Sequence, residues 1–289
     1  MKRVGVVVHP TRAVVDAIEV LENWTSEHGL ELVQIPTGEQ PPVAPAGEVS
    51  GCDLIVALGG DGTVLKALHA SAKARTPALG VAYGSLGALT TVSVEELPAA
   101  LDRFANGDWR RRDLPALRIR AAGEPIAAAL NDVVVARGRG TQLLVDVWVD
   151  RELYVRLAGD GVVVATPLGS SAYSMAAGGP LLVSGADAFV CTPLAMHGGS
   201  APPLVVAGDR EVRLEAHPGH RGFSIDVDGF PVATDQAELS VTRQNAYAVL
   251  VDLDDSTTGF PSLRERGLIS DSPRLIGQDR LTARMDLGG

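Results

Sequence analysis

The sequence predicts an α/β domain followed by a β-rich domain, and two observations carry this prediction. In the first hundred residues, short apolar runs alternate with segments whose apolar residues recur at helical spacing, which is typical of a parallel sheet covered by helices. From about Leu114 onward the chain becomes a series of short runs rich in Val and Leu with turn residues between them, which is typical of β-structure. We therefore expect an α/β domain over residues 1–113 and a β-rich domain over residues 114–253.

The first domain is expected to begin with a strand, a helix and a second strand. Residues 4–8 form a continuous apolar run, as a buried parallel strand does. Residues 12–28 follow as a helix that ends at Gly29, and residues 31–35 give the second strand. Residues 36–51 are rich in Pro and Gly and should form a loop. Since a loop of this length is uncommon inside a compact domain, we expect it to be functional or mobile.

The next strand, residues 54–58, leads directly into the sequence GGDGT of residues 59–63. Val64, Leu65 and Leu68 then recur at helical spacing, so the glycines lie where a strand turns into a helix. The first N–H groups of a helix lack partners, and glycines without a Cβ let phosphate oxygens approach them. An aspartate inside an anion site is electrostatically unfavourable unless it handles a metal or a proton. The motif therefore predicts a phosphate site with a functional carboxylate at Asp61.

The residues around this motif argue against three other interpretations. Gly-Asp-Gly also occurs in ordinary turns, but a turn needs neither two glycines before the Asp nor a strand and a helix on its two sides. The chain contains no Gly-Lys-Ser/Thr, which excludes a Walker loop. The G-x-G-x-x-G pattern of a Rossmann turn is absent at this position as well.

The first domain is expected to close with one more strand and one more helix. Residues 78–82 are apolar and should form a parallel strand. Ser93 and Glu96 have the spacing of a capping box, which predicts a helix that runs to about Asn106. Ligands of such sheets bind beyond the carboxyl ends of the strands, which is where Asp61 is placed.

The second domain is expected to consist of strands with one helical interruption near residues 171–178. After about Asp254 the chain becomes polar and rich in Pro and Ser, and we expect disorder from about Thr282. The expected strands lie within LRIRAAG, PIAAALNDVVVAR, QLLVDVWVD, ELYVRLAG, VVVAT, PLVVAG, EVRLEAH, FSIDVDG, ELSVTR and YAVLVDLD.

Two segments of the second domain are further candidate sites. Gly159-Asp160-Gly161 and a strand precede residues 166–174, TPLGSSAYS, whose small and hydroxyl residues at a helix start suit a phosphate, a ribose or a ring edge. Tyr173 there is able to stack on a base, although this segment taken alone favours a well-capped helix with a core tyrosine. Asn131 and Asp132 suit a clamp on a ribose diol, although an Asx-turn is the commoner role of such a pair.

Composition excludes several classes of function. The formal net charge is −10 and the pI is about 5.1, which argues against nucleic acid or an anionic membrane as the main partner. The single basic run, Arg110 to Arg112, is expected to be a solvated connector. The start of the chain is too quickly polar for a signal peptide, and no run of 18 apolar residues exists, so we expect a soluble, cytoplasmic protein.

Cysteine and histidine patterns do not indicate a metal site. Cys52 and Cys191 lie far apart and form no C-x-x-C motif. His217 and His220 lie in a turn and are expected to lack a third ligand, while His9 follows the first strand and is placed to line the cleft. No residue is directly assignable as a metal ligand.

Taken in order, several motifs resemble those of the NAD kinases, and the similarity covers most of residues 53–235. The motif GGDGTVLKA alone is shared with lipid kinases, whereas GDGVVVATPLGSSAYSMAAGGPLL is much more specific to NAD kinases. The motifs are GGDGTVLKA, LGVAYGSLGAL, LNDVVVARG, GDGVVVATPLGSSAYSMAAGGPLL and DVDG.

The resemblance implies a cytoplasmic kinase that moves a phosphate from ATP or another donor, with Mg²⁺ carried by the nucleotide, to the 2′-hydroxyl of the adenosine ribose of NAD. It implies that the second domain binds substrate, that the tail 254–289 packs back on the first domain, and that the protein forms homodimers or homotetramers. It also implies that Asp61 is the catalytic carboxylate. The residues implied to bind substrate or nucleotide are Gly60, Gly62, Thr63, Lys66, Asn131, Asp132, Asp160, Ser171, Ala172, Tyr173 and Ala176.

Some positions depart from the family pattern. A basic residue and an aromatic residue of the family are replaced by Ser85 and Ala88, and Asp132 stands where the family usually has Glu. Pro202 replaces an arginine, and Phe230 stands where a polar residue is common. These departures leave two alternatives open, a kinase for another nucleoside or nucleotide and a non-catalytic sensor that binds a dinucleotide.

Overall fold

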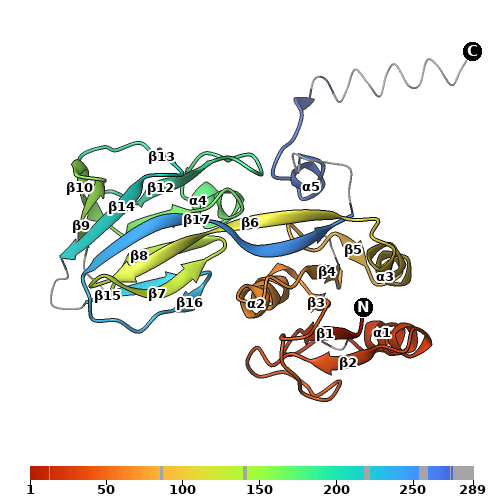
Figure 1. Ribbon diagram of the computed structural model, residues 1–289. Coiled ribbons are helices and arrows are strands. Elements are labelled where there is room, and N and C mark those ends of the chain that lie inside the picture. Colours follow the sequence, from red (N-terminus) through yellow and green to blue (C-terminus); the bar gives the residue numbers. More distant parts are fainter. Residues whose placement is uncertain are drawn as a thin grey trace, which may run out of the picture.

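The computed structural model contains two sheets, one of eleven strands and one of six (Figure 1). In the eleven-stranded sheet, β10-β9-β14-β17-β4-β3-β1-β2 are consecutive neighbours, while β5 pairs with β4 and β6 pairs with β17 and β7. The smaller sheet has the order β13-β12-β11-β8-β15-β16. The structure describes residues 1–12, 14–84, 87–138, 142–217, 222–253, 260–273 and 275.

The parallel part of the large sheet confirms the predicted α/β architecture. Its strands are β1 (Arg3–Val8), β2 (Glu31–Gln34), β3 (Leu54–Gly59), β4 (Ala78–Ala82) and the short β5 (Val92–Ser93). Helices α1 (Val15–Glu27) and α3 (Leu97–Ala105) pack on one face and α2 (Asp61–Ser71) on the other. Alternate residues of each strand point to opposite faces, so both faces need apolar residues, which explains the continuous apolar runs.

The β-rich part is a sandwich whose core lies between the two sheets. The large sheet contributes β6 (Arg110–Ala121), β7 (Glu124–Ala129), β9 (Leu143–Val149), β10 (Glu152–Gly159), β14 (Glu211–His217) and β17 (Glu238–Asp252). The small sheet contributes β8 (Asp132–Arg137), β11 (Gly161–Ala165), β12 (Ala188–Leu194), β13 (Leu204–Ala207), β15 (Phe223–Val227) and β16 (Phe230–Pro231). Buried side chains from both sheets form one apolar cluster, as in other β-sandwiches.

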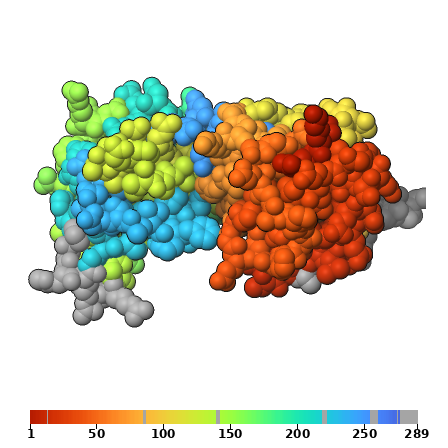
Figure 2. All heavy atoms as spheres, turned by 60° about the horizontal axis from the view of Figure 1, so that its bottom comes forward, coloured from red at the N-terminus to blue at the C-terminus, as the bar shows by residue number. Residues whose placement is uncertain are grey.

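One long strand joins the two parts. The sequence predicted two separate runs over residues 238–252, but β17 is continuous, with an irregularity between Gln244 and Ala248 that includes a left-handed residue, Ala246 (φ 50°). A bulge of this kind bends a strand without ending it. Near its end Leu250 pairs in parallel with Ala78 of β4. The sheet therefore crosses the predicted boundary at 113/114, and Figure 2 shows the red and orange surface of the first residues adjoining the green-to-blue surface of the sandwich.

The basic run of residues 110–112 is part of a strand and not a connector, so that part of the prediction was wrong, whereas Arg110 and Arg111 are exposed as expected. These arginines open β6 and pair with the end of β17, where Arg110 forms an ion pair with Asp252 at 3.3 Å. The Arg112 guanidinium is largely buried, which lowers its pKa, and it donates to Ser184 Oγ at 3.0 Å. Strand pairing with an acidic neighbour offsets the cost of taking the charge out of water.

Other expected elements differ in their bounds. The capping-box contacts exist, since Glu96 Oε2 accepts the Ser93 N–H at 2.9 Å, but the helix begins at Leu97. The expected helix at 171–178 is a 3-10 turn over Gly169–Ser171 followed by α4 (Tyr173–Ala176). The loop at 36–51 is anchored, because the Gln34 and Gln40 side chains donate to the carbonyls of Pro41 and Val8.

The carboxyl-terminal tail is described only in part. Helix α5 (Phe260–Glu265) lies beside the segment that follows β4, where the Ser262 hydroxyl donates to the Gly87 carbonyl at 3.2 Å. The region expected to be disordered, from Thr282, lies outside the described residues. Among the described helices, none is both long and apolar enough to cross a membrane.

Candidate active site

The glycine turn between β3 and α2 combines tight packing with open backbone. A Cβ on Gly59 would lie 2.3 Å from Thr63 Oγ1, so this glycine lets the buried Thr63 pack under the turn. At Gly60 and Gly62 a Cβ would meet nothing within 4 Å. Gly60 caps α2, so the backbone that faces open space belongs to the helix amino end, where unpaired N–H groups attract anions.

Asp61 is the first residue of α2, and both of its carboxylate oxygens are held by backbone. Oδ2 accepts the N–H of Ala88 and Oδ1 accepts the N–H of Leu89, each at 2.9 Å. A Cβ on Gly87 would lie 2.1 Å from Asp61 Oδ1, so only glycine lets this loop pack against the carboxylate. An ionised carboxylate has about four lone-pair positions, so two remain to accept a proton from a ligand.

A small cavity of about 210 Å³ opens at this turn and carries positive charge; we call it the basic cavity. His9 is one of its residues, and its Nδ1 accepts the N–H groups of Thr11 at 3.2 Å and Arg12 at 3.1 Å. Burial, and then the charges of Arg12 and Lys66, lower the pKa of His9, so its imidazole is neutral at pH 7. The lining consists of His9, Pro10, Arg12, Gly60, Gly62, Thr63, Lys66 and Phe230.

A second cavity of about 450 Å³ lies in the sandwich, and we call it the larger cavity. Tyr173 lines it and is 48% exposed, so the alternative of a core tyrosine was wrong. An aromatic ring at a cavity wall suits stacking on a base. The lining consists of Asn131, Asp132, Val134, Ala136, Ala172, Tyr173, Asp226, Asp228 and Gly229.

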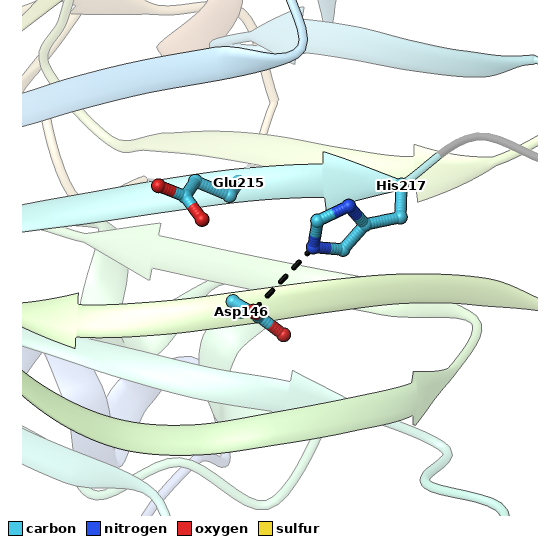
Figure 3. Close-up of side chains that lie close together, drawn as sticks. All are labelled: Asp146, Glu215 and His217. Atoms are coloured by element: carbon cyan, nitrogen blue, oxygen red, sulfur yellow. Dashed lines mark ion pairs between the residues drawn. The ribbon is translucent and has the colours of Figure 1, made fainter.

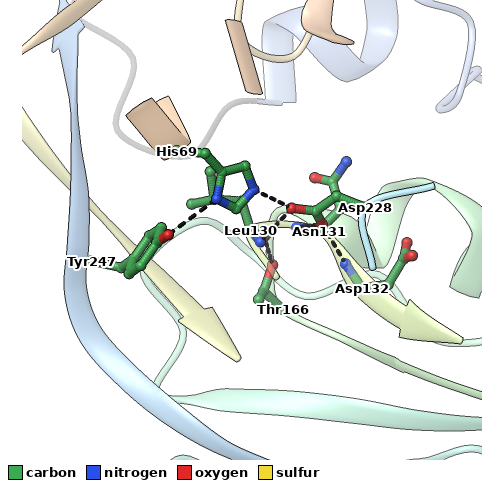
Figure 4. A network of polar contacts seen from close by, with 7 residues as sticks. All are labelled: His69, Leu130, Asn131, Asp132, Thr166, Asp228 and Tyr247. Atoms are coloured by element: carbon green, nitrogen blue, oxygen red, sulfur yellow. Dashed lines mark hydrogen bonds and ion pairs between the residues drawn. The ribbon is translucent and has the colours of Figure 1, made fainter. Parts of the chain in front are cut away.

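The Asp228 side chain organises one wall of the larger cavity (Figure 4). It is 2% exposed and accepts the backbone N–H groups of Leu130 at 2.9 Å, Asn131 at 2.7 Å and Asp132 at 3.1 Å. Asp228 (φ 51°) and Gly229 (φ 79°) are the two left-handed residues of the hairpin between β15 and β16, as a type I′ turn requires. The turn therefore aims a buried carboxylate at the start of β8.

Asp132 is a buried acid with a shifted pKa. It is 6% exposed, and burial, followed by the nearby charge of Asp228, raises its pKa to about 6. Near neutral pH the two protonation states of Asp132 are therefore close in free energy, and its neutral form is able to donate a hydrogen bond.

The start of β8 is also held from β11. Thr166 donates its N–H to the Asn131 carbonyl at 2.8 Å and its hydroxyl to the Leu130 carbonyl at 2.5 Å. A Cβ on Gly169 would lie 2.1 Å from the Asn131 oxygen, so the segment carrying Tyr173 passes directly over this backbone. The motifs around Asn131 and Tyr173 thus meet in one place.

Not all predicted site residues come together. Asp160 lies at the other end of β11, beside Arg137, with which it forms an ion pair at 2.5 Å. Asp132 pairs with Ala165, which lies five positions after Asp160 in the chain, so roughly 16 Å of strand separates Asp160 from Asp132. Ser171 and Ala176 lie next to Tyr173 in the chain but outside the lining of the larger cavity.

The structure adds residues that sequence reasoning missed. Asp228 is part of the motif DVDG, but the sequence alone assigned it no role in the site. The Asp-Gly pair between two strands is nevertheless a strong signal for a hairpin turn. His69 and Tyr247 join the same network, as described below, and carried no local signal. Phe230 follows the hairpin turn, and its ring centroid lies 5.6 Å from Lys66 Nζ.

A separate group of charged side chains lies on the large sheet (Figure 3). The ligand atoms of Asp146, Glu215 and His217 lie within 4.8 Å of one another, so His217 does have further ligands nearby, contrary to the prediction. Asp146 also pairs with Arg156 at 3.4 Å, and Glu215 pairs with Arg213. Arginines already neutralise both carboxylates, which is the arrangement of an ion-pair cluster.

The chain matches two protein-family models and curated relatives. The model of the ATP-NAD kinase N-terminal domain matches residues 39–109, and that of the C-terminal domain matches residues 130–251. The NAD kinase of Moorella thermoacetica is 37% identical over 216 residues, 73% of this chain and 70% of the relative. The NAD kinase of Heliobacterium modesticaldum is 37% identical over 244 residues, 80% of this chain and 86% of the relative.

Two solved structures share the fold. A yeast NADH kinase complexed with NADH superposes with a TM-score of 0.78 at 22% identity, covering 94% of this chain and 89% of that one. An NAD kinase from Archaeoglobus fulgidus in complex with ATP gives 0.72 at 24% identity, covering 91% and 99%. This likeness confirms the predicted fold class.

Proposed function

The chain belongs to the NAD kinase family, and from this premise we propose that it transfers the terminal phosphate of ATP to the 2′-hydroxyl of the adenosine ribose of NAD, giving NADP. The observation that carries the proposal is the fixed carboxylate of Asp61 at an open helix amino end. A weak alcohol nucleophile needs a positioned proton acceptor, and a polyphosphate needs backbone donors and positive charge. The turn at residues 59–63 offers the proton acceptor and the backbone donors within one segment, and Lys66 and Arg12 beside it supply the positive charge.

In the proposed reaction the 2′-oxygen bonds to the terminal phosphorus while the bond from that phosphorus to the bridging oxygen breaks. The hydroxyl proton passes to Asp61, and ADP leaves with the electron pair. The backbone of Gly60 and Gly62, with Lys66 and Arg12, binds phosphate oxygens in the basic cavity. Asn131, Asp132 and Tyr173 hold the adenosine half of NAD in the larger cavity.

We propose that Mg²⁺ enters with the nucleotide. None of the described residues that line the basic cavity carries a carboxylate. The side chains there that carry nitrogen are His9, Arg12 and Lys66. This donor set fits a metal whose ligands are mainly phosphate oxygens, as is usual for Mg²⁺. Asp61 is the carboxylate of this turn that would meet such a metal. When bound, the ion neutralises charge on the transferring phosphate.

The family departures affect this proposal unequally. Ala88 contributes its backbone N–H to Asp61, a contact that does not depend on its side chain. The Pro202 carbonyl accepts the Tyr154 hydroxyl. Ser85 lies outside the described residues.

A cytoplasmic location and assembly into a homodimer or homotetramer stay predictions.

Phosphate transfer by the purified protein tests the proposal. ATP and Mg²⁺ are incubated with NAD, NADH and a panel of nucleosides, and the products are identified by mass. The expected result is NADP, formed only when the metal is present and lost on addition of EDTA. Phosphorylation of a nucleoside without formation of NADP, or binding of NAD without any transfer, would overturn it.

A further inference from the structure

Helix α2 lines the basic cavity near its amino end, and its other end contacts Asp228, a residue that lines the larger cavity. Its first residue is Asp61, and His69 follows eight residues later, roughly 12 Å along the axis. The His69 imidazole lies between Asp228 and Tyr247 (Figure 4). Its Nε2 is 2.7 Å from Asp228 Oδ2, and its Nδ1 is 3.1 Å from the Tyr247 hydroxyl. Neither His69 nor Tyr247 belongs to the lining of either cavity.

The partners determine which imidazole nitrogen carries the proton. Asp228 accepts three backbone N–H groups, as an ionised carboxylate does, so its fourth partner must also donate. The proton therefore lies on His69 Nε2, and in the neutral imidazole Nδ1 accepts from the Tyr247 hydroxyl. This arrangement gives the imidazole a defined orientation.

The four bonds to Asp228 come from two different places. Three come from the backbone of Leu130, Asn131 and Asp132, which forms a wall of the larger cavity. Within the described part of the chain, the fourth is the only side-chain donor, and it comes from α2. The same helix holds the proposed base at its other end. His69 thus connects the wall that would position the acceptor with the helix that carries Asp61.

We infer that His69 is a positioning residue, which sets the larger cavity against α2 so that the acceptor hydroxyl meets Asp61. The inference rests on the proposed function, because transfer between two cavities demands that they be aligned. The backbone donors of the basic cavity do not depend on His69, since Gly60, Gly62 and Thr63 are placed by the helix amino end itself. Loss of His69 should therefore impair the reaction with bound acceptor far more than binding of the donor.

Two substitutions in the full chain separate this role from plain structural support. His69→Leu removes both polar contacts, whereas His69→Gln keeps an N–H able to reach Asp228. His69→Leu should lower kcat with NAD by about ten- to a hundredfold, since a misplacement of about 1 Å costs that much, and should leave the KM for ATP within about twofold. His69→Gln should recover most of the loss. His217→Leu, which breaks another His–Asp pair at 3.4 Å from Asp146, is the matched control and should leave kcat unchanged.

A readout without turnover completes the test. Amide hydrogen exchange of residues 130–132 is measured in the free protein, and it should become faster in His69→Leu but not in His69→Gln. If His69→Leu keeps both its kcat and its exchange pattern, or if the KM for ATP and kcat change together in both variants, the inference is wrong. A wild-type protein that makes no NADP would overturn the proposed function instead, while the exchange data would still decide whether His69 holds this wall.

Discussion

The basic cavity and the larger cavity are built in different ways. Half of the residues that line the basic cavity, Gly60, Gly62, Thr63 and Lys66, come from two adjacent turns of chain, and its main donors are backbone groups placed by one helix. The other half of the lining consists of His9, Pro10, Arg12 and Phe230. The larger cavity joins the start of β8, the segment of Tyr173 and the turn at Asp228, nearly a hundred residues apart in the chain. Its geometry depends on a buried carboxylate that collects donors from different elements.

This difference determines how each cavity should respond to change. A site made of consecutive residues fails only where its own atoms are altered. A site assembled by a buried polar network fails when any member is lost, because the remaining members are left unpaired in a low dielectric. The following predictions test this contrast, beginning with the largest expected effect.

Asp61→Asn should abolish turnover and spare binding. The amide cannot take up the hydroxyl proton, and loss of a general base lowers kcat by roughly 10²- to 10⁴-fold. The side chain keeps its size, but its amide nitrogen is unable to accept the N–H of Ala88 or Leu89, so the loop at residues 87–89 loses one of its two hydrogen bonds to this side chain. ATP affinity, measured by calorimetry, should change little, because the backbone donors at Gly60 and Gly62 remain. Near-normal turnover would remove Asp61 as the base.

A pair of glycine substitutions compares the two cavities directly. Gly62→Ala adds a Cβ to open space within a helix, so it should raise the free energy of unfolding by roughly 0.5–1 kcal/mol, while the new methyl group raises the KM for ATP severalfold. Gly169→Ala places a Cβ 2.1 Å from the Asn131 carbonyl oxygen, so it should destabilise the fold and weaken NAD binding. Denaturant unfolding and the two KM values distinguish the variants. If both variants affected ATP and NAD equally, the cavities would not be independent.

The sequence predicted the local cavity better than the assembled one, for a physical reason. The GGDGT turn shows itself in consecutive residues, because strand, glycines and helix must follow one another to open the backbone. His69 and Tyr247 lie 178 positions apart and meet only through the fold. Likewise, the sequence predicted a connector at Arg110 to Arg112, because the strand partner of this run, the end of β17, lies far away in the sequence. The parallel sheet and the β-rich part were predictable, whereas the strand that joins them was not.

The pH dependence of stability tests how much free energy it costs to bury the Asp132 carboxylate in the wall of the larger cavity. Its pKa is raised to about 6, so the folded protein binds this proton more tightly than the unfolded chain, and stability from this group is lost as pH rises through the window from about 4 to 6. Asp132→Asn removes the titration. The free energy of unfolding of Asp132→Asn, relative to that of the wild type, should therefore rise by up to about 3 kcal/mol across that window. Above the window the difference should level off. Urea unfolding of both proteins between pH 4.5 and 8 measures the difference, and a constant difference would contradict the shifted pKa.

Phe230 gives the smallest expected effect and lies where the two cavities meet. Asp228 and Gly229 line the larger cavity and Phe230 lines the basic cavity, so one turn belongs to both walls. The half-exposed ring faces Lys66 Nζ at 5.6 Å, a contact of roughly 0.5–1 kcal/mol at an exposed site. Phe230→Leu removes this attraction but keeps an apolar side chain, so the KM for ATP should change by about two- to fivefold through Lys66, with the KM for NAD unchanged. A change in the KM for NAD alone would contradict the contact with Lys66 and would mean that Phe230 acts on the larger cavity through the turn at Asp228.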